Sequence, residues 1–489
     1  MAPTATKRII TIDILRGITI FAMILCANIY FPNLPAWMFH GQTPPVEHVV
    51  TTYSGEFLTE VNTSTYTTFD FNPDVKGITW VDLVFPFFLF TMGAAFPLAM
   101  RKKLENGVSK WSITGSLVRR WITLTVFAIA LGNAYSIGWA SPRPDIVKGI
   151  YNIALWAVMF MALVRVKDEK KTQLINNIGL FMTVVMGVLA VDYMGITLSR
   201  WNSDVIIMIL ANIAITGGLL WMFTKDNMRL RWLVLIFIIA LKALSSYAPE
   251  ALSWVPGLEC IGWFFNWGYL QYLVIALAGS IVGDKLLEHS RSGETVNIDK
   301  QHLGAACIAL TAMFVQLWGL FTRQVLADFI ISAVLAVVFV AMTWKRRNIM
   351  TWLGSFGFAF MLVGLCFDPI DGGITKDCYN HLGEVTTNLS YMLTTTGMTA
   401  LTGAFVLALE LKWNIKGRGF SGCGQNPMLA YTVTNFLIMP ILAMTGLGAV
   451  LTEWGYSSAT GAMVNGLVYT LLMVLITCIF TKLKMFWRS

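Results

Sequence analysis

The chain has 489 residues, of which 56% are hydrophobic and 13% charged, and its mean hydropathy is +0.65. A soluble globular protein carries about 25% charged residues, so this composition excludes one and favours a membrane protein. The net charge of +8 requires no nucleic-acid partner, because basic residues also orient membrane proteins.

Fourteen apolar stretches follow one another along the chain, each near the ~20 residues that cross a bilayer as a helix. Their expected ranges are 9–30, 80–100, 119–137, 148–165, 173–193, 204–224, 231–247, 268–285, 303–321, 324–344, 350–367, 388–410, 427–447 and 463–483. Backbone polar groups in lipid must be paired within their own segment. We therefore predict an all-α polytopic integral membrane helix bundle of 12–14 transmembrane helices, with residues 1–489 forming a single domain. The first stretch is expected to be a retained helix, since no small-residue cleavage site follows it.

The basic residues lie mostly in every second gap between these stretches. If the N-terminus is cytoplasmic, 28 of the 35 Lys and Arg residues lie on the inner side and 7 on the outer side. This four-to-one bias is a strong positive-inside signal. It predicts that both termini are cytoplasmic.

Two outer loops are long enough to contribute to a site, residues 31–79 and 368–387. The chain has only five histidines, and three of them, His40, His48 and His381, fall in these loops. Histidine is the side chain best suited to proton transfer near neutral pH. An isolated loop histidine beside aromatic residues is usually an interfacial residue, so the surroundings of His40 decide its interpretation.

Asn28 ends the first apolar stretch twelve positions before His40, and Asp82 lies at the start of the second stretch. A carboxylate within an apolar and aromatic span is costly unless it is paired or functional. Because a short antiparallel helix pair brings these positions to one membrane face, we expect Asn28, His40 and Asp82 to form an outward-facing site.

The sequence around these residues resembles a known family. The segment TIDILRGITIFAMILCAN, followed by WMFH and GITWVDLVFPFFLFTMGAAFPLAM, is similar to the transmembrane acyltransferases related to heparan-α-glucosaminide N-acetyltransferase, particularly their bacterial branch. Weaker similarity follows in RRWITLTVFAIALGN, WGYLQYLVIALAGSIVGDKL, NLSYMLTTTG and GQNPMLAY. In that family the histidine stands only a few residues before the Gly-hydrophobic-Thr motif. Residues 41–76 therefore resemble an insertion after His40, and His48 is an alternative to it.

The resemblance implies acetyl transfer from cytoplasmic acetyl-CoA to an amino sugar or glycan on the outer side of a bacterial inner membrane. His40 would either accept the acetyl group as a nucleophile or act as a general base. Asn28 would stabilise the oxyanion, and Asp82 would fix the imidazole tautomer or orient the acceptor. No metal is expected, nor any nucleic-acid partner. Membrane lipid is an expected partner, and homodimerisation stays open.

Two further groups of residues are candidate binding sites under this resemblance. At the inner end, Arg119 and Arg120 could hold the phosphates of acetyl-CoA, although such residues also serve orientation alone. Asp13 and Arg16 are candidates for the same site, but their spacing of one helical turn also suits an ion pair within the membrane.

Outside, His48, Lys376 and Asp377 are candidate acceptor contacts. The competing hypothesis for the whole chain is a proton-coupled secondary transporter. It predicts interrupted helices in matching halves, a pattern that we do not find in the sequence.

Overall fold

The computed structural model describes residues 9–54, 59–68, 75–166, 168–248, 262–294, 296–375, 378–379 and 385–487. Within these ranges, 14 helical segments are long and apolar enough to cross a membrane, which confirms the predicted helix-bundle class and count. An even number of spans is what the predicted placement of both termini on one side of the bilayer requires.

The spanning segments follow the predicted order. They are α1 (Thr11–Asn28), η3 with α2 (Trp80–Leu83 and Val84–Glu105), α3 (Lys110–Ala140), α4 (Asp145–Leu163), α5 (Glu169–Asp192), α6 (Val205–Thr224), α7 (Met228–Tyr247), α9 with α10 (Trp267–Leu270 and Leu273–Ser292), α11 (Lys300–Thr322), α12 (Val325–Thr343), α13 (Ile349–Phe367), α14 (Leu389–Trp413), α16 with η5 and α17 (Pro427–Val433, Thr434–Ile438 and Met439–Met444) and α19 (Ala459–Lys482). Shorter helices are η1 (Ala36–Met38), η2 (His40–Gln42), α15 (Arg418–Gln425) and α18 (Leu447–Ser457).

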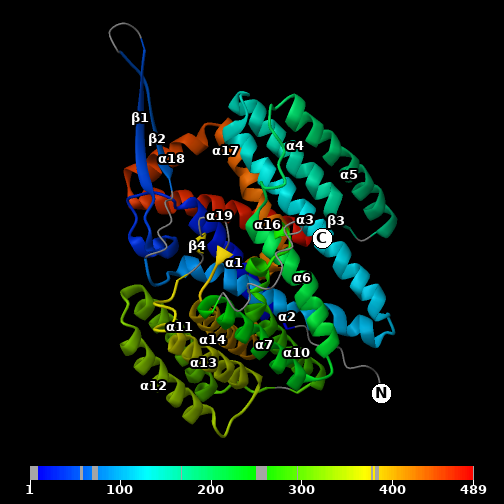
Figure 1. Cartoon of the computed structure of the whole chain (residues 1–489), viewed down its shortest axis with the longest axis vertical. Coiled ribbons are helices and arrows are strands. Elements are labelled where there is room, and N and C mark those ends of the chain that lie inside the picture. The colour runs from blue at the N-terminus through cyan, green and yellow to red at the C-terminus, as the bar shows by residue number, and fades with distance from the viewer. Residues whose placement is uncertain are drawn as a thin grey trace.

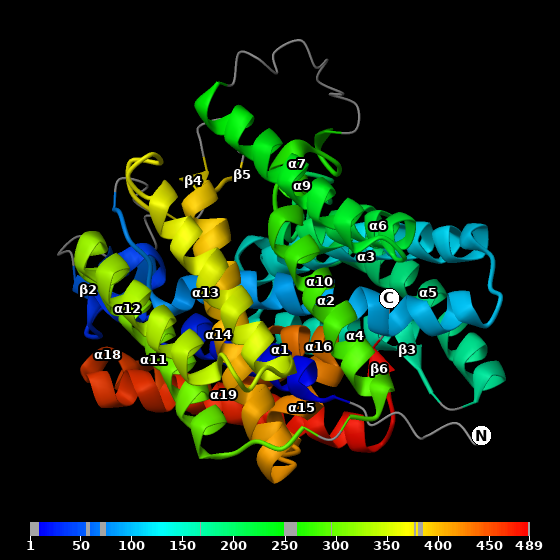
Figure 2. The same ribbon diagram turned by 90° about the horizontal axis from the view of Figure 1, so that it is seen from below.

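The helices form a buried centre with a lipid-facing rim. Figures 1 and 2 show α1 and α2 between α11–α13 on one side and α3–α5 on the other. In the 18-residue apolar stretch of α14, 89% of the residues are buried, whereas only 17% are buried in the corresponding stretches of α5 and α12. The exposed side chains of the rim are large and apolar, such as Phe181 and Leu326. Such a surface is stable against lipid and unfavourable in water.

Close backbone contact fixes α2, which continues η3 and its Asp82, against α10. A Cβ atom on Gly93 would lie 1.9 Å from the carbonyl oxygen of Ala276, and one on Gly283 would lie 2.3 Å from that of Ala94. Small residues permit such approach between membrane helices. The crossing therefore holds the outer end of α2 in a defined position.

The start of α1 is held by a residue remote in sequence. The carboxylate of Glu410, on α14, accepts hydrogen bonds from the backbone N–H groups of Ile10 and Thr11, both at 2.8 Å. α1 has no side-chain cap of its own at this end. Glu410 thus satisfies N–H groups that the helix leaves unpaired and ties α1 to the buried centre.

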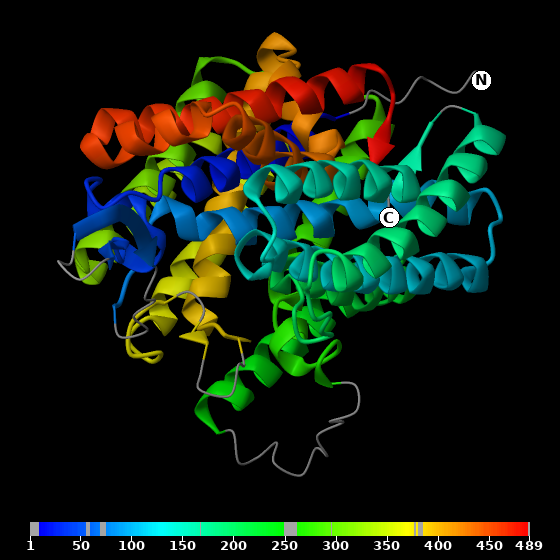
Figure 3. The ribbon, with the colours of Figure 1, turned by 90° about the horizontal axis from the view of Figure 1, so that it is seen from above.

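The outer loop 31–79 contains strands that the sequence analysis did not predict. β1 (Val46–Ser54) and β2 (Thr59–Thr68) form an antiparallel pair with Val46 opposite Thr68. Figures 1 and 3 show this hairpin at the edge of the helical body, and in Figure 1 it stands clear of it. Two short strand pairs, β3 (Val164–Arg165) with β6 (Phe486–Trp487) and β4 (Cys378–Tyr379) with β5 (Val385–Thr386), complete the sheet structure of the described ranges.

Candidate functional site

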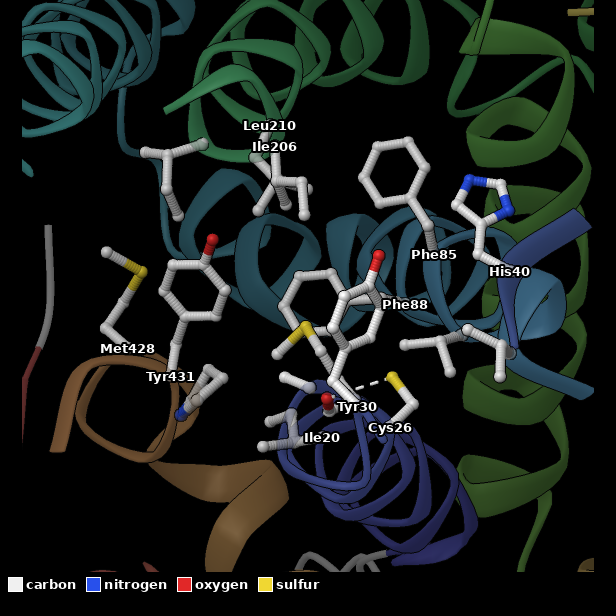
Figure 4. A pocket seen from close by; sticks show the side chains of 16 residues that line it. Ile20, Cys26, Tyr30, His40, Phe85, Phe88, Ile206, Leu210, Met428 and Tyr431 are labelled. Atoms are coloured by element: carbon white, nitrogen blue, oxygen red, sulfur yellow. Dashed lines mark hydrogen bonds between the residues drawn. The ribbon is translucent and has the colours of Figure 1, made fainter. Parts of the chain in front are cut away.

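A cavity of about 300 Å³ lies between α1, α2, α6 and α16 (Figure 4). Aliphatic and aromatic side chains form most of its wall, and His40 is the one lining residue with an imidazole. Along α1 the lining runs from Ile20 to Ala27, which is about 10 Å at 1.5 Å per residue. Largely apolar cavities with a few polar groups are typical of small-molecule sites.

Asp82 lies in η3, the short helix that leads into α2, and is completely buried. Thr79 precedes it as the N-cap of η3, and the two residues form a capping box. Oδ2 of Asp82 accepts hydrogen bonds from the N–H of Thr79 at 2.8 Å and from the N–H of Gly41 at 3.2 Å. These donors compensate for much of the cost of a buried carboxylate. They leave the other oxygen, Oδ1, directed at the imidazole of His40.

His40 reaches the cavity from the loop that joins α1 to α2. Its Nδ1 lies 2.5 Å from Oδ1 of Asp82, and about a quarter of its side chain is exposed. The loop is fixed on both sides of the histidine, because the Thr79 hydroxyl donates to the carbonyl of Phe39 at 2.8 Å and Gln42 Nε2 donates to the carbonyl of Phe321 at 3.2 Å. These bonds fix the backbone on either side of His40, and the Asp82 carboxylate is the contact of the imidazole itself.

The contact between His40 and Asp82 decides what the imidazole can do. A carboxylate at Nδ1 favours a proton on that nitrogen and leaves the lone pair on Nε2. His40 is also a lining residue of the cavity. A carboxylate-oriented imidazole of this kind can remove a proton from a bound molecule or attack an electrophilic carbon.

A second polar group faces the same cavity from α16. The hydroxyl of Tyr431, a lining residue, donates to Oδ2 of Asp204 at 2.6 Å. Asp204 is the N-cap of α6, and its Oδ1 accepts from the N–H of Ile207 at 2.9 Å. Burial raises the pKa of Asp204, whereas the hydrogen bonds from Tyr431 and Ile207 oppose that change. Tyr135, on α3, hydrogen-bonds to Tyr431 behind this pair.

Sequence reasoning missed the pair of Tyr431 and Asp204. An aspartate immediately before an apolar stretch is a recognisable helix-start signal, so the position of Asp204 was predictable. Its partner lies 227 residues away along the chain. No local pattern connects the two.

The model of one sequence family matches residues 8–286, which is more than half of the chain. This family is described as a domain of unknown function, DUF5009. The chain belongs to the DUF5009 family. The DUF5009 match includes His40, Asp82 and Asp204, and it ends before α16. A search of curated proteins found no match for the chain.

Asn28 lies in the DUF5009 segment but is not among the residues that line the cavity. Its side-chain amide donates to the carbonyl of Ile24 in its own helix at 2.7 Å, and its backbone carbonyl accepts from Nδ2 of Asn465 at 2.6 Å. Ala27 faces the cavity, and the next residue points about 100° further around the helix. The structure therefore brings together His40 and Asp82, while Asn28 serves the contact between α1 and α19.

The four residues predicted to contact acetyl-CoA at the inner end also lie in different surroundings. Arg16 donates to the carbonyl of Thr91 at 2.9 Å and to that of Gly424 at 3.2 Å, and Asp13 acts on it electrostatically. Arg120 lies close enough to Arg16 for the two cations to repel each other. Arg119 is exposed, and Thr123 donates to its backbone carbonyl at 2.8 Å. Arg120 is exposed, whereas Arg16 lies one turn of α1 before Ile20 of the cavity; we refer to Arg16 and Arg120 as the inner cationic pair.

Of the outer acceptor candidates, His48 is described by the structure and is not among the residues that line the cavity. His48 lies on β1, where its Nε2 is 2.6 Å from the hydroxyl of Thr68. Lys376, Asp377 and His381 lie outside the described residues. Within the described ranges no group of three or more His, Cys, Asp or Glu side chains is placed to hold a metal ion.

Proposed function

We propose that this chain is a membrane-embedded acetyltransferase, which moves an acetyl group from cytoplasmic acetyl-CoA to an amino sugar or glycan on the other side of a bacterial inner membrane. The observation that supports this proposal most is the pair of His40 and Asp82 at a mostly apolar cavity between membrane-spanning helices. A water-poor cavity protects a thioester from hydrolysis and strengthens the electrostatic interactions inside it.

The chemistry follows from the orientation of the imidazole. Nε2 of His40 takes the proton of the acceptor amine or hydroxyl as the acceptor attacks the thioester carbonyl carbon. The C–S bond breaks, and the imidazolium returns its proton to the departing thiolate of CoA. Asp82 stabilises the imidazolium while it carries this proton. In the alternative scheme, Nε2 attacks the thioester itself and carries the acetyl group to the acceptor.

The inner cationic pair suits the phosphates of acetyl-CoA. Arg120 is exposed and the Arg16 charge acts on it, so an anion bound near both would be favourable. From Arg16 to Ala27 the rise of α1 is about 16 Å, a path that a long, thin thioester arm would follow towards His40. This arrangement would keep the nucleotide on the inner side and bring only the acyl end to the outer half of the cavity.

The test is acetyl transfer by purified protein from radiolabelled acetyl-CoA to a panel of amino sugars and glycosaminoglycan fragments. We expect His40→Ala to lower kcat by at least about 10²-fold while the protein still folds. His48→Ala is the matched control and should retain activity, because β1 lies away from the cavity wall. Transfer that survives in His40→Ala would overturn the proposed site. A wild-type protein that transports protons or solute but transfers no acetyl group would establish the competing transporter hypothesis.

A further inference from the structure

The hydrogen bonds around Tyr431 have a defined direction. Its single hydroxyl proton is donated to Asp204. On the other side of Tyr431 lies Tyr135, whose oxygen accepts from Nδ2 of Asn435 at 3.3 Å. Because Asp204 takes the hydroxyl proton of Tyr431, that proton is not available to a ligand in the cavity.

This direction determines which ligand groups Tyr431 can bind. A phenolic oxygen has a proton to donate and two lone pairs to accept. The proton of Tyr431 is used by Asp204, so a ligand in the cavity can meet only lone pairs of this oxygen. The carboxylate behind it adds negative charge. The site therefore selects a hydrogen-bond donor, either a hydroxyl or a protonated amine, and disfavours an anion.

Tyr431 and His40 lie at opposite sides of the same cavity. Figure 4 shows Tyr431 on the side of Met428 and His40 beyond Phe85, with Tyr30 between them. The Tyr431 hydroxyl points towards α6. A ligand that reaches both residues needs two polar groups separated by a body that can pack against aromatic rings. A pyranose ring with hydroxyl and amino substituents has this form.

We propose that Tyr431, held by Asp204, anchors the acceptor sugar through one of its hydroxyl groups and so places its amine at His40. This inference rests on the proposed function, because it assigns Tyr431 to the acceptor of that reaction. Tyr431 is a binding residue in this scheme and takes no part in proton transfer. It should consequently affect the KM for the acceptor and leave kcat at saturation almost unchanged.

The experiment compares Tyr431→Phe with wild type in lipid nanodiscs, which avoids sugar-based detergents. Binding of D-glucosamine is measured by calorimetry, and its acetylation is measured in parallel. Loss of one hydrogen bond should weaken binding and raise the KM by about 10-fold, with kcat within about threefold of wild type. Tyr151→Phe is the matched control, because the buried Tyr151 hydroxyl donates to the carbonyl of Met186 at 2.6 Å and Tyr151 is not a lining residue. It should change neither quantity.

The outcomes separate this inference from the proposed function. Wild-type protein that binds glucosamine but does not acetylate it would refute the transferase and leave the anchor standing. Unchanged binding in Tyr431→Phe, or a loss in kcat alone, would refute the anchor. If Tyr431→Phe fails to fold, 3-, 4- and 6-deoxyglucosamine are tested on wild type. One of them should bind about 10-fold more weakly than glucosamine, and equal binding of all three would refute the anchor.

Discussion

Replacing Asp82 with asparagine should abolish most of the activity while leaving the fold almost intact. Oδ2 of Asp82 accepts from the N–H groups of Thr79 and Gly41 at 2.8 and 3.2 Å, and Oδ1 lies 2.5 Å from Nδ1 of His40. An asparagine oxygen in the Oδ2 position would keep both backbone donors satisfied. Its NH₂ group would then face Nδ1 and require a lone pair there. The proton would move to Nε2, which could no longer act as a base.

The Asp82 substitutions should affect kcat and stability to different degrees. The wrong tautomer should lower kcat by about 10²–10⁴-fold, whereas Asp82→Asn should lose less than about 1 kcal/mol of stability. Asp82→Ala leaves two buried N–H donors without an acceptor and should lose about 2–4 kcal/mol. Acetyl transfer to glucosamine gives kcat, and thermal unfolding in nanodiscs ranks the two variants. If Asp82→Asn kept kcat within about threefold of wild type, Asp82 would have no role in orienting the imidazole.

Three further predictions test other parts of the account. Arg120→Gln should raise the KM for acetyl-CoA about 10-fold or more without changing that for the acceptor, because it removes a phosphate contact worth a charged hydrogen bond; an equal rise for both substrates would argue against a phosphate site. Gly93→Ala should lower Tm, since its Cβ would lie 1.9 Å from a backbone oxygen of α10, whereas Gly115→Ala enters open space and should be neutral or stabilising; equal Tm values would contradict the close crossing. In a cysteine-free background, Glu47→Cys should label from outside intact cells and Ser292→Cys only after permeabilisation, and labelling of both from one face would refute the topology.

The helix count was predictable from the sequence because hydrophobic length and charge bias act locally. Each span must satisfy its own backbone, and the fourteen predicted segments correspond to the fourteen observed. The pairing of His40 with Asp82 was also within reach, since both belong to consecutive elements at one membrane face. The sequence analysis did not predict the strands of the insertion, although the Val, Thr and Tyr residues of β1 and β2 are typical of strands.

The remaining parts of the site depend on contacts between distant segments. Asn28 was expected beside His40 because both lie at the same depth. Depth does not determine the rotation of a helix, and the packing of α1 against α19 turns Asn28 towards Asn465. Tyr431 enters the cavity only because α16 packs beside α6 and α1. When a helix is apolar on all sides, the periodicity of its sequence predicts neither its rotation about its own axis nor the helices beside which it packs.

The most direct test of the central claim is the sidedness of acetyl transfer in sealed proteoliposomes. Radiolabelled acetyl-CoA is supplied only on the face that carries Ser292, and glucosamine is enclosed on the face that carries His40. The account predicts labelled N-acetylglucosamine in the glucosamine compartment for wild type and its loss in His40→Ala. Labelled product that forms only when both substrates share the Ser292 face would contradict the account.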